Sequence, residues 1–120
     1  MKKILLSISL TFSVMYMPAA LSNPADSVYE QARELLDSGK QMESLRSSYD
    51  VDDHLQCNDT MKSNMVKAQN LESEAQELEV SAFQLKLAAI ELHACTSCAK
   101  NAIESCNRVD EALTSYKNGS

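Results

Sequence analysis

Proline and glycine are nearly absent from this chain of 120 residues, which contains two of each and no tryptophan. No proline follows Pro24, and the two glycines are Gly39 and Gly119. Since these residue types are the ones that interrupt a regular backbone, nothing in residues 40–118 breaks a helix by backbone chemistry alone. Good helix formers predominate there. No long stretch alternates apolar and polar residues as a strand would, so the sequence predicts an all-α fold.

Basic residues are also scarce. The chain has 11 Lys and Arg residues against 17 Asp and Glu residues, and its formal net charge is −6. Proteins that bind the phosphates of nucleic acids carry a basic patch, and this sequence has no basic cluster. We therefore expect no nucleic-acid partner and no attachment to an anionic membrane surface.

The first 22 residues have the three parts of a secretory signal peptide. Lys2 and Lys3 form a positive start, residues 4–17 are apolar, and Ala20-Leu21-Ser22 supplies small residues for cleavage. The apolar stretch is shorter than the roughly 20 residues that span a bilayer. We expect a signal peptide over residues 1–22 that is cleaved after Ser22, and no membrane span in the mature chain. The mature protein is then expected in the periplasm of a Gram-negative bacterium, or secreted.

Residues 23–120 are enough for one small domain. Asn23 and the proline after it are typical of a helix start, and a first helix is predicted over residues 24–48. A long central helix is predicted over 59–94 and a last helix over 101–117. The predicted fold is a small antiparallel bundle of about three helices, with an amphipathic, coiled-coil-like central helix and stabilising disulfides.

The predicted central helix carries an apolar seam with alternating steps of three and four residues, the spacing of a heptad repeat. The seam alternates between alanine and leucine: Ala68, Leu71, Ala75, Leu78, Ala82, Leu85, Ala89 and Leu92. A second stripe, of Val80, Phe83, Leu87 and Ile90, predicts that the end of this helix contacts two neighbours. The shorter helices cannot cover the whole seam, so we expect it to form the interaction surface for a homodimer or for a helical partner.

Three of the four cysteines are close together in the sequence: Cys95, Cys98 and Cys106. An even number of cysteines in a short exported chain is typical of disulfides, and four cysteines allow three pairings. A disulfide needs Cα atoms within about 7 Å, whereas Cys95 and Cys106 would lie about 16 Å apart along one continuous helix. Either the helix breaks within the cysteine segment, or these cysteines pair elsewhere. Thr96 and Ser97 are weak helix formers, and they favour the break.

The fourth cysteine, Cys57, lies near the start of the predicted central helix. If that helix is straight, Cys57 is about 57 Å from Cys95. Cys57 can then join an internal disulfide only if the helix bends back or is shorter than predicted. Otherwise it is the natural candidate for an intermolecular disulfide, which would lock a dimer.

The cysteine segment also has two chemical alternatives to structural disulfides. Cys95 and Cys98 form a CxxC pair, but thioredoxin-type redox chemistry places that motif at a helix start after a β-strand, and no strand is predicted. The metal alternative uses nitrogen and sulfur ligands of the kind that bind zinc or copper: His93, Cys95, Cys98 and Cys106.

No other part of the sequence indicates catalysis, because there is no Gly-rich phosphate loop and neither histidine has a context that suggests a catalytic triad. We expect no enzymatic activity and no cofactor. The predicted function is that of an exported helical protein acting through protein–protein interaction. Examples are an accessory of the envelope or of a secretion apparatus, an immunity or exclusion protein, and a chaperone-like adaptor. The alternative is a small periplasmic metal-binding protein.

Overall fold

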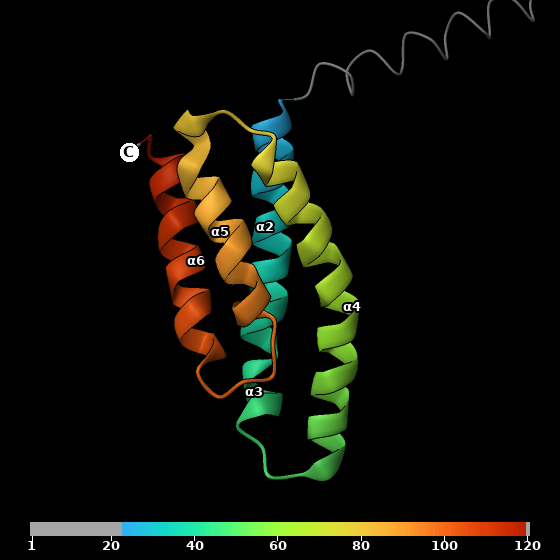
Figure 1. The fold of residues 1–120 in the computed structure, drawn as a ribbon. Coiled ribbons are helices and arrows are strands. Elements are labelled where there is room, and N and C mark those ends of the chain that lie inside the picture. Colours follow the sequence, from blue (N-terminus) through green and yellow to red (C-terminus); the bar gives the residue numbers. More distant parts are fainter. Residues whose placement is uncertain (1–22, 120) are drawn as a thin grey trace, which may run out of the picture.

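The structure, a computed structural model, describes residues 23–119, and this range is helical and contains no strand. The predicted signal peptide lies outside the described residues. Successive long helices run in opposite directions (Figure 1), which confirms the predicted all-α, disulfide-linked bundle. The elements are α2 (Pro24–Gln41), α3 (Glu43–Arg46), α4 (Val51–Gln76), the short 3₁₀ helix η1 (Val80–Ala82), α5 (Phe83–Cys95) and α6 (Ala102–Lys117).

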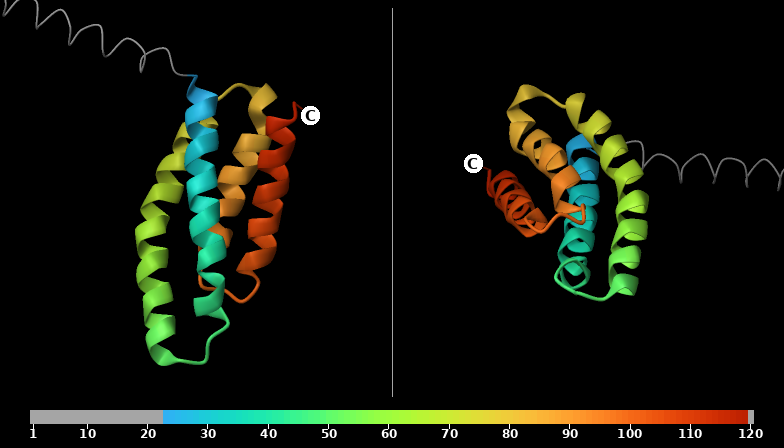
Figure 2. Two further views of the ribbon diagram at one scale, coloured as in Figure 1. Left: turned by 180° about the vertical axis from the view of Figure 1, so that it is seen from behind. Right: turned by 60° about the horizontal axis from the view of Figure 1, so that its bottom comes forward.

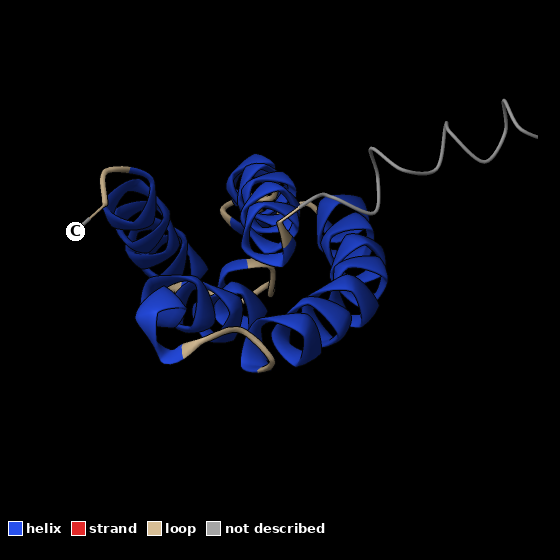
Figure 3. Ribbon diagram, turned by 90° about the horizontal axis from the view of Figure 1, so that it is seen from above, coloured by secondary structure: helices blue, strands red, loops and turns tan. Residues whose placement is uncertain are grey.

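Helix α2 lies in the middle of the bundle and contacts α4, α5 and α6. Helices α5 and α6 form an antiparallel hairpin on one side of α2, and α4 covers another side (Figure 3). The start of α4 extends beyond the α5–α6 loop and lies near α3 (Figure 2). The core therefore sits where α2 meets the other three long helices.

The start of α2 follows the sequence prediction. The Asn23 side chain accepts a hydrogen bond from the backbone N–H of Ala25 at 2.9 Å, and Pro24 occupies the first turn. Asp26 adds a negative charge at the positive end of the helix dipole. The helix ends at Gln41 rather than at the predicted residue 48, because the chain turns at Met42 into the separate short helix α3.

Helix α4 begins at Val51, eight residues before the predicted start at residue 59. The Asp50 side chain accepts a hydrogen bond from the backbone N–H of Asp52 at 2.8 Å and so caps the helix. Asp52 and Asp53 lie in the first turn, where carboxylates interact favourably with the helix dipole. The acidic residues before position 59 thus mark the start of this helix.

The predicted continuous helix over 59–94 is wrong, because the chain breaks after Gln76 and folds back before α5. Glu79 adopts an extended conformation between the two helices, although no proline or glycine lies there. A straight helix over 59–94 would be about 54 Å long, whereas the 18 residues of α2 cover only about 27 Å. Folding back brings both halves of the apolar seam against α2, which buries more apolar surface than a straight helix could.

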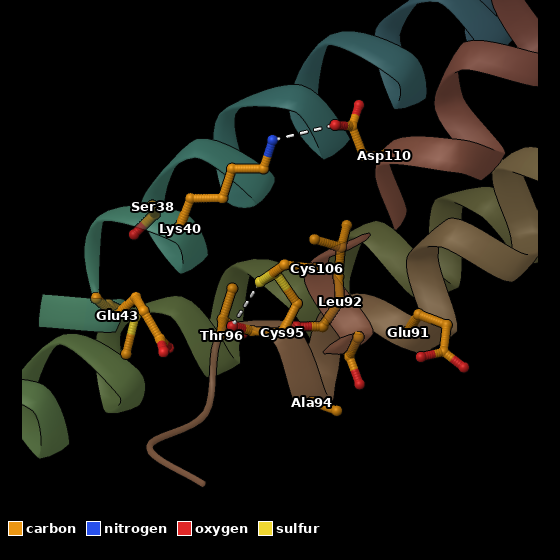
Figure 4. Close-up of a disulfide and its surroundings, with 12 residues drawn as sticks. Ser38, Lys40, Glu43, Glu91, Leu92, Ala94, Cys95, Thr96, Cys106 and Asp110 are labelled. Atoms are coloured by element: carbon orange, nitrogen blue, oxygen red, sulfur yellow. Dashed lines mark hydrogen bonds and ion pairs between the residues drawn. A yellow bond between two sulfur atoms is a disulfide. The ribbon is translucent and has the colours of Figure 1, made fainter. Parts of the chain in front are cut away.

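The fold pairs all four cysteines within the chain. Cys95 and Cys106 join the end of α5 to α6, with their Cα atoms 4.6 Å apart (Figure 4). Cys57, on α4, bonds to Cys98 in the α5–α6 loop, with a Cα separation of 6.1 Å. The prediction of a break within the cysteine segment is confirmed. Cys57 is not available for an intermolecular disulfide, because the backward fold of α5 brings Cys98 next to it.

Gly39 allows α2 to approach the Cys95–Cys106 disulfide. A Cβ atom at this position would lie 2.5 Å from the Sγ of Cys95 and 2.8 Å from its carbonyl oxygen. Both distances are far below a normal van der Waals contact, and neither the disulfide nor the backbone can move away easily. Glycine costs about 1 kcal/mol of helix propensity relative to alanine, and here it permits close packing in return.

Arg46, the last residue of α3, is a buried cation whose side chain is only 1% exposed. Its guanidinium donates to the carbonyl oxygens of Cys95 at 2.5 Å and of Ser97 at 2.7 Å, and it pairs with Glu43 at 2.9 Å. The carbonyls at the end of a helix have no partner within the helix and carry its negative dipole end. Arg46 therefore completes the C-terminal end of α5 from another element.

Asp110 on α6 links this helix to α2 through two ion pairs. It accepts from Lys40 at 3.1 Å and from Arg33 at 3.4 Å. The hydrogen bond from Lys40 and the two positive charges hold the pKa of Asp110 below its ordinary value of 3.8, despite partial burial. Because the folded pKa is lowered, the stabilisation is present above the ordinary pKa and is lost as the pH falls through the folded value. About 41% of the Asp110 side chain is exposed, so these ion pairs contribute little to the free energy of unfolding.

Candidate functional site

The apolar seam, which the sequence predicts as an interaction surface, lies almost entirely in the core. Ala68, Leu71 and Ala75 on α4 are at most 1% exposed, and Leu85, Ala89 and Leu92 on α5 are also at most 1% exposed. Ala82 is 8% exposed, and Leu78 is partly buried against the same core. The prediction of a free seam is wrong, because the backward fold of α5 allows α2 to cover both halves.

The second stripe has the opposite outcome. Val80 is 84% exposed, and Phe83, Leu87 and Ile90 are between 49% and 53% exposed. The sequence predicts that this stripe contacts a second neighbouring helix, but no other helix of residues 23–119 covers it. The second stripe, which begins in η1 and continues along α5, is therefore apolar surface that the fold leaves open on the side facing away from the core.

A shallow groove runs between the second stripe and α6. Phe83 and Leu87 form its α5 side, and Ala112 and Ser115 contribute from α6. The charged residues along the groove are Glu91, Arg108 and Glu111. Because Ala112 is small, the α6 wall is low beside the two large apolar side chains. The arrangement resembles the grooves that receive one side of an extended or helical segment.

The charges beside the groove are mostly acidic. Glu91 on α5 accepts from Arg108 on α6 at 3.0 Å, so these two charges neutralise each other. Glu111 is exposed and has no ion-pair partner among the described residues. Glu104 lies seven residues earlier on the same face of α6 and is likewise exposed without an ion pair. The α6 side of the second stripe thus has an uncompensated negative charge.

A smaller apolar patch lies at the start of α4. Tyr49 is fully exposed, and Val51 and Leu55 are 71% and 56% exposed. Three aspartates accompany these residues, at positions 50, 52 and 53, and form the helix start described above. Sequence analysis missed this patch because its members do not form a heptad seam. In the sequence, the only indication of this patch is the four-residue spacing of Val51 and Leu55.

The cysteine segment does not form the proposed metal site. Cys95, Cys98 and Cys106 all belong to disulfides, and the described residues contain no free cysteine. A disulfide sulfur is not a thiolate, which is the form of cysteine that binds a metal ion. His93 also lies apart from this chemistry, since its Nε2 contacts Glu72 on α4 at 2.6 Å. Residues 23–119 contain no cluster of His, Cys, Asp and Glu that could hold a metal ion.

The CxxC pair of Cys95 and Cys98 is divided between the two disulfides. Cys95 closes the α5–α6 hairpin, whereas Cys98 attaches the loop to α4. Thioredoxin-type chemistry needs the two cysteines of the motif to pair with each other. The pairing observed here is that of two structural crosslinks.

Within residues 23–119, no helix combines the length and the apolar character that crossing a membrane requires. Comparison of the chain with protein-family models, with curated proteins and with solved structures found no match. The candidate site is therefore defined by the geometry of the chain alone: the second stripe, its groove against α6, and the acidic residues beside it.

Proposed function

We propose that this protein is exported and acts outside the cytoplasm as a non-enzymatic scaffold that binds another protein through the second stripe. The disulfides support export, because such bonds persist in oxidising compartments such as the periplasm or the cell exterior. A disulfide-linked bundle keeps the binding surface in a constant shape, and an adaptor or accessory of the cell envelope needs such a surface.

The exposure of the second stripe is the single observation that carries the proposal. Phe83, Leu87 and Ile90 lie on one face of α5 and are about half exposed. Contact between this apolar surface and water is unfavourable, so its burial by a partner would be favourable. Single exposed apolar residues are normal in soluble proteins, but contiguous apolar patches mark interaction sites. Burial of this surface by a partner would contribute about 25 cal/mol to the free energy of binding for each Å² of apolar surface removed from water.

If the protein is exported, its first 22 residues should be removed. The chain isolated from the envelope fraction should begin at Asn23, which is the residue that caps α2 and so leaves the whole bundle intact. Intact-mass measurement would show loss of the first 22 residues. A mass that retains them would contradict cleavage after Ser22.

Photo-crosslinking in cells tests the interaction. A photoreactive phenylalanine analogue at position 87 should give a covalent adduct with another protein of the envelope, because Leu87 lies in the middle of the second stripe. The adduct should disappear when Phe83→Ser and Ile90→Ser are introduced together. Gel mobility and mass spectrometry of the purified adduct would measure both effects.

Leu55 provides the matched control, since it is also an α-helical leucine and is 56% exposed, compared with 51% for Leu87. The same photoreactive residue at position 55 should not give the adduct. If position 87 gives none, or if the adduct persists when the rest of the second stripe is made polar, the proposed function is wrong.

A further inference from the structure

We infer that the occupant of the second stripe is an amphipathic α-helix of a partner protein, with basic residues along the flank that faces α6. This inference rests on the proposed function and names the kind of partner. Val80, Phe83, Leu87 and Ile90 follow one another in steps of three, four and three residues. This is the heptad spacing with which one helix packs lengthwise against another.

The size of the surface favours one partner helix over a second copy of the chain. Helix α5 has 13 residues and is about 20 Å long. The three exposed stripe residues of α5, with Val80 in η1 just before it, offer roughly a few hundred Å² of apolar surface. A stable dimer needs about 800 Å² from each partner, so α5 packed against its own copy would fall short. A single helix that lies along α5 and enters the groove beside α6 uses the surface fully.

The charges on the two sides of the second stripe differ, and they specify the flanks of the partner helix. On the α6 side, Glu104 and Glu111 have no ion pair within residues 23–119, while Glu91 and Arg108 pair with each other. On the other side lies Lys86, seven residues before His93 and on the same face of α5. His93 contacts Glu72 of α4, so that face is directed towards α4. A partner helix with lysine or arginine towards α6 would pair with the free carboxylates.

Two synthetic amphipathic peptides with the same leucine seam test the inference, one flanked by lysine and the other by glutamate. Fluorescence anisotropy with the full mature, oxidised chain would give both affinities. The lysine peptide should bind about tenfold more tightly than the glutamate peptide. Leu87→Ser should weaken its binding about tenfold, because the central apolar contact is lost, while Leu55→Ser should change it by less than about twofold.

A charge reversal separates specific docking from general attraction to an acidic protein. Glu111→Lys should weaken binding of the lysine peptide about fivefold and strengthen binding of the glutamate peptide. Glu30→Lys, an equal change at an exposed position of α2, should leave both affinities within about twofold. Equal effects of the two reversals would mean that only net charge matters, and would overturn the inference.

Peptide binding and crosslinking at position 87 distinguish failure of the helix inference from failure of the proposed function. If neither peptide binds while position 87 still gives its adduct in cells, the partner is not a basic amphipathic helix, but the proposed function stands. A dimer in sedimentation that dissociates on Leu87→Ser would identify a second copy as the occupant and would also overturn the inference. If position 87 gives no adduct, the proposed function itself is wrong.

Discussion

Reduction of the two disulfides is expected to leave the chain largely unfolded at about 37 °C. By the entropy of loop closure, the Cys95–Cys106 bond, with a sequence separation of 11, contributes about 3 kcal/mol. The Cys57–Cys98 bond, with a separation of 41, contributes about 4 kcal/mol. A domain of this size is stable by about 5–15 kcal/mol, so the two bonds together account for much of its free energy of unfolding.

Thermal melts followed by circular dichroism, with and without reductant, would measure this effect. Each kcal/mol lost lowers the Tm of such a domain by about 4–8 °C, so the reduced chain should melt at least about 25 °C lower. Oxidised and reduced chains with the same Tm would show that the disulfides do not stabilise the fold.

Removal of each disulfide is expected to destabilise a different part of the structure. Cys57 is the only buried residue in the first half of α4, residues 51–63, so the Cys57–Cys98 bond is the main link between this segment and the bundle. Replacing both of these cysteines with serine should raise hydrogen exchange in residues 51–63 more than elsewhere. Replacing Cys95 and Cys106 instead should raise it in α5 and α6, since that bond lies in their shared core.

Arg46→Ala is expected to lower the free energy of unfolding by about 3 kcal/mol, because hydrogen bonds from a charged donor contribute about 1.5–3 kcal/mol each. The substitution leaves the carbonyls of Cys95 and Ser97 without their donor inside the bundle. Arg46→Lys should recover only part of the loss, since an ammonium group cannot reproduce the forked geometry of a guanidinium. Urea denaturation of the oxidised chains would measure both changes.

Arg108→Ala is the matched control for this prediction. Arg108 also pairs with a glutamate at 3.0 Å, but 56% of its side chain is exposed, and exposed ion pairs contribute about 0–1 kcal/mol. If Arg46→Ala costs no more than Arg108→Ala, the helix-capping role of Arg46 is wrong.

The sequence by itself determined the features that depend on neighbouring residues. The shortage of proline and glycine and the excess of helix formers predicted the all-α class, and Asn23 with Pro24 predicted the start of α2. The weak helix formers Thr96 and Ser97 favoured a break between Cys95 and Cys106, and the geometry of a disulfide required one if these two cysteines pair. Each of these inferences needs only local chemistry, which the order of residues contains in full.

The tertiary structure alone decided which apolar stripe is buried. The seam and the second stripe have the same kind of spacing, and both are apolar, so periodicity cannot tell the core from the surface. The backward fold after Gln76 made the choice, because it presents the seam to α2 and turns Phe83 and Leu87 outward. No proline or glycine marks this fold-back, because what stabilises it is the packing of both halves of the seam against α2.

The same fold-back decided the pairing of Cys57 and the role of Arg46. Cys57 meets Cys98 only when α5 returns along α4, and Arg46 reaches the end of α5 only in that arrangement. These contacts join residues that are 41 to 51 positions apart. Local propensity carries no information about such distant pairs, because what selects them is the apolar surface that the whole bundle buries.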